Sequence, residues 1–354
     1  MKIFSLNSKI DRIIQSNGES YRYFSGTSYL GIGQVAAYQK SLQKGMDKFG
    51  FNHGQSRMNN VRLSVFEEFE AFFAENAGAE DAIVMSSGYL AGFASWQMLY
   101  AQADQTWIAP DTHSAILPSG KKPDPTVSFE DWKNDCLRQS SNLPSGKFLI
   151  LGNAVDPLSA KIHDYQWIDA ISRKHEVTLL IDDSHAFGVL GKSIFGTYSA
   201  INLPNVNLVI SGSLGKGLAM PAGIILGKKE TLNTIRSQPI FGGASPGSPA
   251  NLFAFLNSQQ IYLSQREKLM ELCGRFHKSV HGLNEISGKP EFSVFIYRPD
   301  SWVEKLEKEK IITSSFPYPT AGDPRINRIV ISAFHEVKDI DFLLKILQKL
   351  SSNS

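Results

Sequence analysis

The middle of the chain alternates short apolar runs with segments of helical periodicity. The apolar runs lie at 82–87, 106–110, 147–152, 177–183, 207–213 and 223–227, and helical patterns such as 90–102 and 165–175 lie between them. Strands that are apolar along their whole length are typical of a mostly parallel sheet covered by helices on both faces. The pattern predicts a large α/β domain over residues 35–247.

Two flanking segments are expected to form a second, smaller domain. Residues 1–34 form a short entry segment with a strand near 21–25, and this segment is expected to pack with the small domain. From residue 248 to residue 354 a long helical pattern, two apolar runs and two further helices predict an α+β unit. A chain of 354 residues also exceeds the ~250–300 residues at which single cores stop growing.

Composition and charge exclude several classes of protein. The chain carries 36 Lys and Arg against 34 Asp and Glu, and the basic residues form no stripe, so nucleic-acid binding is not expected. No apolar run approaches the ~18–20 residues of a membrane span, and the first residues lack a signal core, which predicts a cytoplasmic protein. Cys136 and Cys273 form no metal or redox motif, so no metal is expected.

The first chemical feature is the segment SSGYLAG at 86–92, which follows an apolar run and precedes a helical pattern. Ser87 can cap a helix, Gly88 allows close backbone approach, and the helix N-terminus favours an anion such as phosphate. An ordinary turn between a strand and a helix has the same pattern, so this motif alone leaves both interpretations open.

The second feature is IDDSHAFGVLG at 181–191, where an apolar strand delivers Asp182, Asp183 and His185 together. Buried acids and histidines are costly unless they are paired or used in function. A metal site is one alternative, although no further cluster of ligands supports it. A structural, hydrogen-bonded turn is the other.

The third feature is SGSLGKG at 211–217, where Lys216 follows a buried strand. The spacing does not match a phosphate-binding P-loop, because Ile210 and Gly217 stand where a glycine and a hydroxyl residue are needed. A partly desolvated lysine suits Schiff-base chemistry, whereas the alternative is a lysine in a surface loop.

Pyridoxal phosphate needs an anion cradle, a lysine and a carboxylate for its ring nitrogen, and the three features together supply them.

With these motifs the chain resembles the fold-type I pyridoxal phosphate enzymes, and within them the α-oxoamine synthases, over about 23–347. Members include 8-amino-7-oxononanoate synthase and glycine C-acetyltransferase. The similarity is carried by YFSGTSYLG, GQSR, SSGYLAG, DTHSAI, IDDSHAFGVLG, SGSLGKG and RIVISAFHEVKDIDFLL. It implies a PLP-dependent transferase fold, with a large cofactor domain and a smaller C-terminal domain.

The resemblance also implies a role for individual residues around the cofactor ring. Lys216 would form the Schiff base with pyridoxal 5'-phosphate and later act as the base. Asp182 would pair with the ring nitrogen, His185 would hydrogen-bond the ring hydroxyl oxygen, and His113 would stack on the ring face.

The phosphate and the substrate are assigned in the same way. The backbone at Ser87, Gly88 and Tyr89 and the hydroxyl of Ser213 would bind the phosphate. Arg328 falls where the family places the arginine that binds the substrate carboxylate, a natural bidentate pair. The alternative for Arg328 is a surface salt bridge.

The chain departs from the family on the acyl side of the site. Positions 26–28 carry Gly26, Thr27 and Ser28 where the family has Ser-Asn-Asp, and Ile150 and Ala154 stand at positions expected to face the ligands. The loop 241–248 also lacks the usual Tyr-Ser-Thr run that reaches the neighbouring subunit.

The implied activity is the decarboxylating condensation of an amino acid with an acyl-CoA, most similar to that of 8-amino-7-oxononanoate synthase, in a homodimer. An aminotransferase or another enzyme that acts at the α-carbon is the alternative within the same fold. A non-catalytic homologue that serves as a binding subunit is the third.

Overall fold

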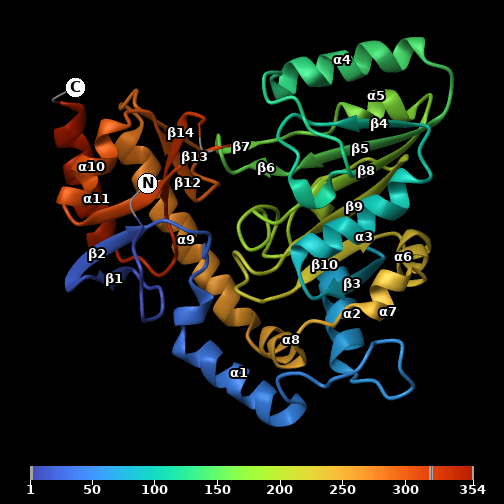
Figure 1. Cartoon of the computed structure of the whole chain (residues 1–354), viewed down its shortest axis with the longest axis horizontal. Coiled ribbons are helices and arrows are strands. Elements are labelled where there is room, and N and C mark those ends of the chain that lie inside the picture. The colour runs from blue at the N-terminus through green and yellow to red at the C-terminus, as the bar shows by residue number, and fades with distance from the viewer. Residues whose placement is uncertain (1–2, 319, 321, 353–354) are drawn as a thin grey trace. The chain divides into compact units, whose positions relative to one another are not determined.

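A computed structural model describes residues 3–318, 320 and 322–352 of the chain (Figure 1). The chain divides into two compact units. The larger unit comprises Ala37–Val155 and Ile162–Gln259, and the smaller comprises Met1–Ala36, Asp156–Lys161 and Gln260–Ser354. The boundary at 259/260 lies beyond the expected one at 247/248, and the short segment 156–161 joins the smaller unit.

The larger unit is built on a six-stranded sheet with the order β3-β10-β9-β8-β5-β4. Its strands are β3 (Asp81–Met85), β4 (Gln105–Ile108), β5 (Lys147–Asn153), β8 (Glu176–Asp182), β9 (Val206–Ser213) and β10 (Gly223–Gly227). Strands β4, β5, β8 and β9 run parallel, and β10 lies antiparallel between β3 and β9. The predicted mostly parallel α/β sheet is confirmed.

Helices and short 3-10 segments complete the larger unit. They are α1 (Ala36–Phe49), α2 (Val65–Ala77), α3 (Gly88–Tyr100), η2 (Ser114–Ile116), α4 (Phe129–Asn142), α5 (Ile168–Ser172), η3 (Tyr198–Ala200), α6 (Lys229–Arg236), α7 (Pro239–Gly243) and α8 (Pro249–Leu256). The helical pattern at 165–175 becomes only the short α5. The long pattern from residue 248 is two helices, because the chain leaves helical structure at Asn257 and Ser258.

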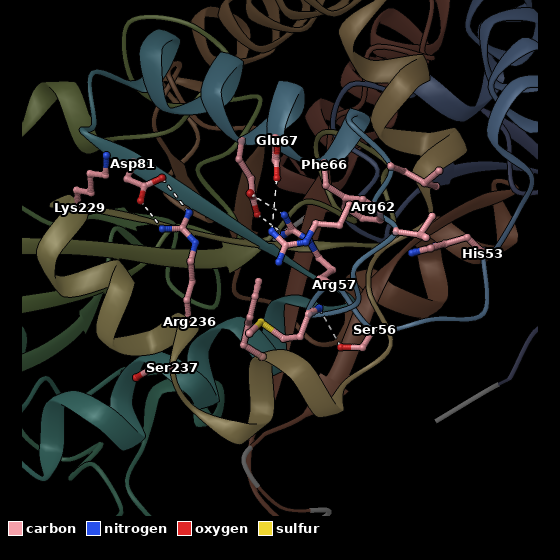
Figure 2. Close-up of a pocket in the computed structure, with 15 residues that line it drawn as sticks. His53, Ser56, Arg57, Arg62, Phe66, Glu67, Asp81, Lys229, Arg236 and Ser237 are labelled. Atoms are coloured by element: carbon pink, nitrogen blue, oxygen red, sulfur yellow. Dashed lines mark hydrogen bonds and ion pairs between the residues drawn. The ribbon is translucent and has the colours of Figure 1, made fainter.

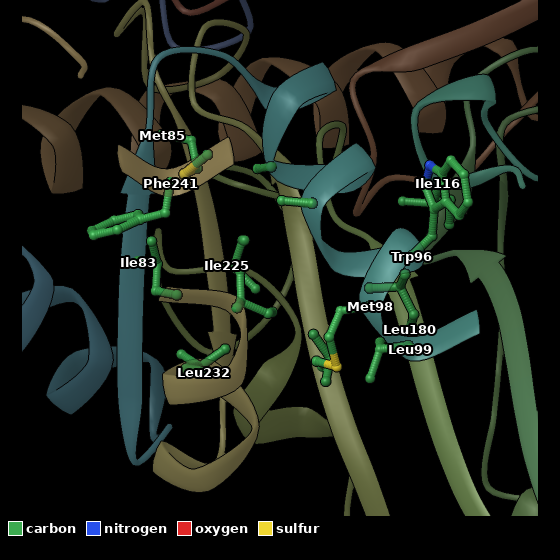
Figure 3. Close-up of a cluster of buried hydrophobic side chains, with 14 of the residues drawn as sticks. Ile83, Met85, Trp96, Met98, Leu99, Ile116, Leu180, Ile225, Leu232 and Phe241 are labelled. Carbon is green, nitrogen blue, oxygen red and sulfur yellow. The ribbon is translucent and has the colours of Figure 1, made fainter. Parts of the chain in front are cut away.

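One part of the core of the larger unit lies between α3 and the sheet. Trp96, Met98 and Leu99 of α3 belong to one cluster with Leu180 of β8 and Ile225 of β10 (Figure 3). Burial of such side chains stabilises the fold by about 1.5–3 kcal/mol each. The helix is therefore held rigidly against the strands, and its N-terminus is fixed at their ends.

The smaller unit is built on a second six-stranded sheet with the order β1-β2-β13-β14-β12-β11. Its elements are β1 (Ile13–Ser16), β2 (Glu19–Phe24), η1 (Ile32–Gln34), α9 (Gln259–Val280), β11 (Ile286–Gly288), β12 (Val294–Tyr297), α10 (Ser301–Lys308), β13 (Ile311–Pro317), β14 (Arg325–Val330) and α11 (Val337–Ser351). The short strands β6 (Val155–Asp156) and β7 (Lys161–Ile162) lie where the chain passes between the units.

Buried polar contacts fasten the N-terminal strands of the smaller unit to its C-terminal helix. Asp339 at the start of α11 is fully buried and binds Arg12 at 3.1 Å and Arg22 at 3.5 Å. His335 contacts the Tyr23 carbonyl oxygen at 2.9 Å, and its Nδ1 accepts from the Ser332 N–H. Burial lowers the pKa of His335 to about 4, so this ring is neutral near pH 7.

In the part of the chain that the structure describes, no helix is both long and apolar enough to span a bilayer.

Candidate active site

The ends of three neighbouring strands place polar residues side by side at one edge of the large sheet. Asn153 at the end of β5 is paired in register with Asp182 at the end of β8, and Asp182 is paired with Ser211 near the end of β9. Parallel strands bring their carboxyl ends to the same edge, which is where open α/β sheets bind ligands. The register therefore fixes where a ligand site can form.

Asp182 is buried and ionised. It is 5% exposed, and the Ser184 N–H donates to its Oδ1 at 2.8 Å. Its Oδ2 lies 3.5 Å from Nδ1 of His113. Burial by itself raises the pKa of Asp182, but its contact with His113, the charge of Lys216 and a hydrogen bond from Ser184 together hold it below its usual value. The sheet edge thus presents a fixed negative charge.

His113 lies on the turn between β4 and η2, with about half of its side chain exposed. Its Nδ1 accepts from the Ala115 N–H at 3.2 Å, which makes it the N-cap of η2. The imidazole is therefore held by its backbone turn beside Asp182 and keeps an open face. A planar ring bound at this edge could stack against that face.

Lys216 follows β9 on a turn rich in small residues and is half-buried. The Gly215 N–H donates to Ser213 Oγ at 3.1 Å, and the Ser213 N–H donates to Ser184 Oγ at 2.8 Å. A Cβ at Gly217 would lie 2.3 Å from the carbonyl oxygen of Phe187, so only glycine permits this close approach. The turn is thus tied to the turn after β8, and the lysine charge acts on Asp182.

The residues predicted to bind phosphate lie where α3 begins. Ser87 is the N-cap of α3 and accepts from the Leu90 N–H at 3.2 Å. A Cβ at Gly88 would lie 2.4 Å from Ser213, so a glycine is needed for the two segments to meet. Gly88 is buried, whereas Tyr89 is exposed. The helix N-terminus and the Ser213 turn therefore lie together, and N-terminal N–H groups bind anions.

His185 lies on the turn after β8 and is half-buried. Asp183, between the two site residues of this turn, accepts from the Thr197 N–H at 2.6 Å and its hydroxyl at 2.8 Å. Burial raises the pKa of Asp183 to about 7 against the effect of those two bonds, and the charge of Asp182 adds to the rise. Asp183 thus fits the structural, hydrogen-bonded turn that the sequence left open.

Arg328 belongs to β14 of the smaller unit and is 9% exposed, so a surface salt bridge does not describe it. Its Nη1 donates to the Pro157 carbonyl oxygen at 3.2 Å, and its guanidinium lies 4.9 Å from the centre of the Phe316 ring. Its Nε is buried with no hydrogen-bond partner among the residues the structure describes. Burial lowers the pKa of Arg328, and Tyr29 and Asp156 oppose this effect.

Three residues of this region were not singled out from the sequence. Asn153, Asp111 and His163 form a connected set of hydrogen bonds behind His113. An asparagine at the end of an apolar strand, one strand away from Asp182, was the available signal. Ile150 and Ala154, expected to face the ligands, are both buried, and Ile150 lies in the middle of β5.

A cavity of about 720 Å³ lies elsewhere in the larger unit and contains none of the predicted site residues (Figure 2). Three ion pairs line it: Arg57 binds Glu70 at 2.5 and 2.9 Å, Arg236 binds Asp81, and Arg62 lies 4.0 Å from Glu67. Each arginine is already paired with its own carboxylate. The chemistry of the sheet edge, and not cavity size, therefore identifies the candidate site.

The residues at the sheet edge fit pyridoxal phosphate. An ionised carboxylate, a half-buried lysine, an open imidazole face and a helix N-terminus with a glycine cradle are the groups that this cofactor requires. The fold and this edge together define an α/β transferase of the fold-type I class.

The family model for aminotransferase class I and II matches residues 28–347, and the chain belongs to this family. It is 24% identical to 8-amino-7-oxononanoate synthase of Fervidobacterium nodosum, over 99% of the chain and 93% of the relative. Serine palmitoyltransferase of Sphingomonas wittichii shares the fold with a TM-score of 0.80 at 16% identity, over 99% of this chain and 92% of that one. The structure of 8-amino-7-oxononanoate synthase of Francisella tularensis has a TM-score of 0.71 at 19% identity. The match covers 94% of this chain and 98% of that one. The resemblance inferred from the motifs is confirmed.

Proposed function

We propose that the chain is a PLP-dependent acyltransferase that condenses an amino acid with an acyl-CoA and releases carbon dioxide. Its similarity to relatives named 8-amino-7-oxononanoate synthase supports this proposal. The observation that carries the proposal is the ionised, buried Asp182 beside His113, with the charge of Lys216 acting on it. A carboxylate in this state keeps a pyridine nitrogen protonated.

Each predicted side chain has a place in binding the cofactor. Asp182 holds the proton at the ring nitrogen, His113 orients the ring, and His185 binds the ring hydroxyl oxygen. The N–H groups at Gly88 and Tyr89, with the Ser87 cap and the Ser213 hydroxyl, bind the phosphate. Bound there, pyridoxal phosphate supplies an electron-withdrawing ring that stabilises negative charge on the α-carbon of the amino acid.

The remaining chemistry is assigned to Lys216 and Arg328. Arg328, whose buried Nε has no partner among the described residues, binds the α-carboxylate. Lys216 Nζ removes the α-proton. A bond forms between the α-carbon and the acyl carbonyl carbon, the carbon–sulfur bond breaks and CoA leaves as the thiolate, which takes a proton from water. The carboxylate then leaves as carbon dioxide, and Lys216 returns a proton to the α-carbon.

The direct test is thiol release. The protein loaded with pyridoxal phosphate is mixed with each of glycine, alanine and serine and with acyl-CoA thioesters of increasing chain length, and free CoA is followed over time. We expect one pair to give turnover that Lys216→Ala abolishes. Absence of CoA release with every pair would contradict the proposed function.

An aminotransferase is the second candidate, because the residues at 26–28 depart from the α-oxoamine synthase pattern. An amino acid donor would then convert the bound cofactor to pyridoxamine phosphate and release a keto acid. Formation of keto acid without CoA release would favour this candidate. A protein that binds neither substrate class would be the non-catalytic homologue.

We also propose that the chain forms a homodimer. Three large apolar side chains are exposed on the loop between α1 and α2: Phe51 at 71%, Met58 at 58% and Val61 at 62%. Apolar side chains gathered on one loop often mark a protein interface. Light scattering coupled to size-exclusion chromatography should give twice the 39.2 kDa chain mass, and Phe51→Glu should shift it towards the monomer.

A further inference from the structure

The turn that carries His113 is fastened to the sheet by the side chain of Asn153. Oδ1 of Asn153 accepts from the His113 N–H at 3.1 Å, and Nδ2 donates to the Asp111 carbonyl oxygen at 2.5 Å. One amide thus binds the backbone on both sides of Thr112. Because Asn153 is 5% exposed and ends a strand that is paired on both sides, it provides a rigid anchor.

The carboxylate of Asp111 is fastened in turn by His163. Nε2 of His163 donates to Asp111 Oδ2 at 2.8 Å, and the side chains are 5% and 16% exposed. The imidazole stacks on the Phe129 ring of α4 with 3.9 Å between ring centres. Asp111 Oδ1 is buried with no hydrogen-bond partner in the described part of the chain. The His163 bond is therefore a main contact of a largely buried carboxylate, whose removal is expected to be costly.

These contacts form one connected set, which extends from His163 to Asp182 at the edge of the large sheet. His163 holds Asp111, Asn153 holds the backbone of Asp111 and His113, and His113 Nδ1 lies 3.5 Å from Asp182. Asn153 is also the register partner of Asp182 on the neighbouring strand. The same residue thus sits beside the carboxylate and holds the turn that carries the imidazole.

We propose that Asn153, supported by the Asp111–His163 pair, is a positioning residue that fixes the His113 imidazole beside Asp182 and against the face of the bound cofactor ring. The part that concerns the cofactor rests on the proposed function. The part that concerns the position of His113 does not, so the two can be tested separately.

The backbone of Asn153 is held independently of its side chain. The Tyr165 hydroxyl donates to the Asn153 carbonyl oxygen at 2.8 Å, and the next residue, Ala154, donates its N–H to the Asp182 carbonyl oxygen at 3.0 Å. Asn153→Ala therefore removes the contacts of the side-chain amide with His113 and Asp111 while β5 keeps its pairing. This makes the variant a usable probe of position.

The first experiment needs no cofactor. Hydrogen exchange of the His113 amide is measured in the wild-type protein and in Asn153→Ala. Loss of the bond to Oδ1 should speed exchange of that amide by about tenfold, the factor expected for one hydrogen bond. Equal exchange rates in the two proteins would overturn the proposal, whether or not the protein binds pyridoxal phosphate.

The second experiment asks whether Asn153 acts through His113. The visible circular dichroism of bound pyridoxal phosphate and its dissociation constant are measured for Asn153→Ala, His113→Ala and the double variant. Asn153→Ala should weaken binding by about tenfold and change the signal. In the His113→Ala background it should change the dissociation constant less than twofold. Full additivity in the double variant would show that Asn153 acts elsewhere and would overturn the proposal.

The third experiment uses a matched pair of buried histidines. His163→Gln is compared with His175→Gln, because His175 is also buried and contacts the Ser140 carbonyl oxygen at 2.9 Å, outside the connected set. We expect both variants to lose stability, but only His163→Gln should speed exchange at His113 and change the cofactor signal. The same effect from both variants would mean a general structural role and would contradict the proposal.

Discussion

Asp182 and Asp183 are neighbours in the chain and are both buried, yet their pKa values move in opposite directions. Asp182 faces His113 and Lys216, and its contact with His113, the charge of Lys216 and a hydrogen bond from Ser184 outweigh the effect of burial. Asp183 faces Thr197, and burial raises its pKa to about 7. The two adjacent carboxylates thus have different roles. Asp182 remains ionised at the sheet edge, and Asp183 binds the segment at Thr197.

The raised pKa of Asp183 predicts how stability depends on pH. A carboxyl group with a higher pKa in the folded state binds a proton more tightly there than in the unfolded chain. The contribution of Asp183 to the stability of the fold is therefore complete below about pH 4 and is lost as the pH rises towards 7. Asp183→Asn lacks this dependence, and the difference in unfolding free energy between wild type and variant should shrink by about 1–4 kcal/mol over that range.

Urea unfolding of both proteins at pH 4.5, 6 and 7.5 measures this difference directly. Asp182 does not interfere, because its lowered pKa places its own transition below the usual value of 3.8. A difference that stays constant across the three pH values would contradict the assignment of a raised pKa to Asp183.

Gly88→Ala should damage the phosphate cradle. The added Cβ would lie 2.4 Å from both the backbone and the side chain of Ser213, so the start of α3 or the turn before Lys216 must move. We expect pyridoxal phosphate to bind at least tenfold more weakly. Gly274→Ala is the control: nothing lies within 4 Å of its added Cβ in α9, and it should stabilise the protein by up to about 1 kcal/mol.

Equilibrium dialysis against pyridoxal phosphate and thermal melting give the two readouts. If Gly88→Ala binds the cofactor as tightly as Gly274→Ala does, the phosphate is not held where α3 begins.

Asp156→Ala should weaken amino acid binding through Arg328. Asp156 accepts from the Leu158 N–H at 2.8 Å and from the Ser159 hydroxyl, and these bonds shape the turn whose Pro157 carbonyl oxygen binds Arg328. Without the turn the guanidinium loses a fixed contact. We predict KM for the amino acid to rise about three- to tenfold with little change in kcat, as expected when ground-state and transition-state binding fall equally.

The matched control is Asp164→Ala, because Asp164 forms a similar bond with the Gln166 N–H at 2.9 Å on an exposed turn of the larger unit. Its KM should remain that of the wild-type protein. Equal increases in KM for both variants would remove the link between Asp156 and Arg328.

The sequence predicted the sheet, and which polar residues lie near the ends of its strands, for a physical reason. The strands β5, β8 and β9 are buried on both faces, so their apolar runs are unambiguous. Asp182 is the last residue of β8, and Lys216 lies on the turn after β9. The short helix α5 was overestimated, because its periodic pattern extends into turns on both sides.

The supporting contacts of His113 could not be predicted in this way. Asp111, Asn153 and His163 come from three segments whose side chains meet only after β4 and β5 have paired. The spacing of these residues in the sequence does not predict that their side chains come into contact. For the same reason the motif predicts a role for Arg328, whereas its contact with Pro157 required the structure.

The central claim is that Lys216 binds pyridoxal phosphate covalently at this sheet edge. The most direct measurement is the visible absorption spectrum of the purified protein with added cofactor, followed by borohydride reduction and mass spectrometry of the peptide that contains Lys216. We predict a visible band for the wild-type protein, a cofactor adduct on Lys216 after reduction, and neither in Lys216→Ala. An adduct on another lysine, or no bound band in the wild-type protein, would contradict the account.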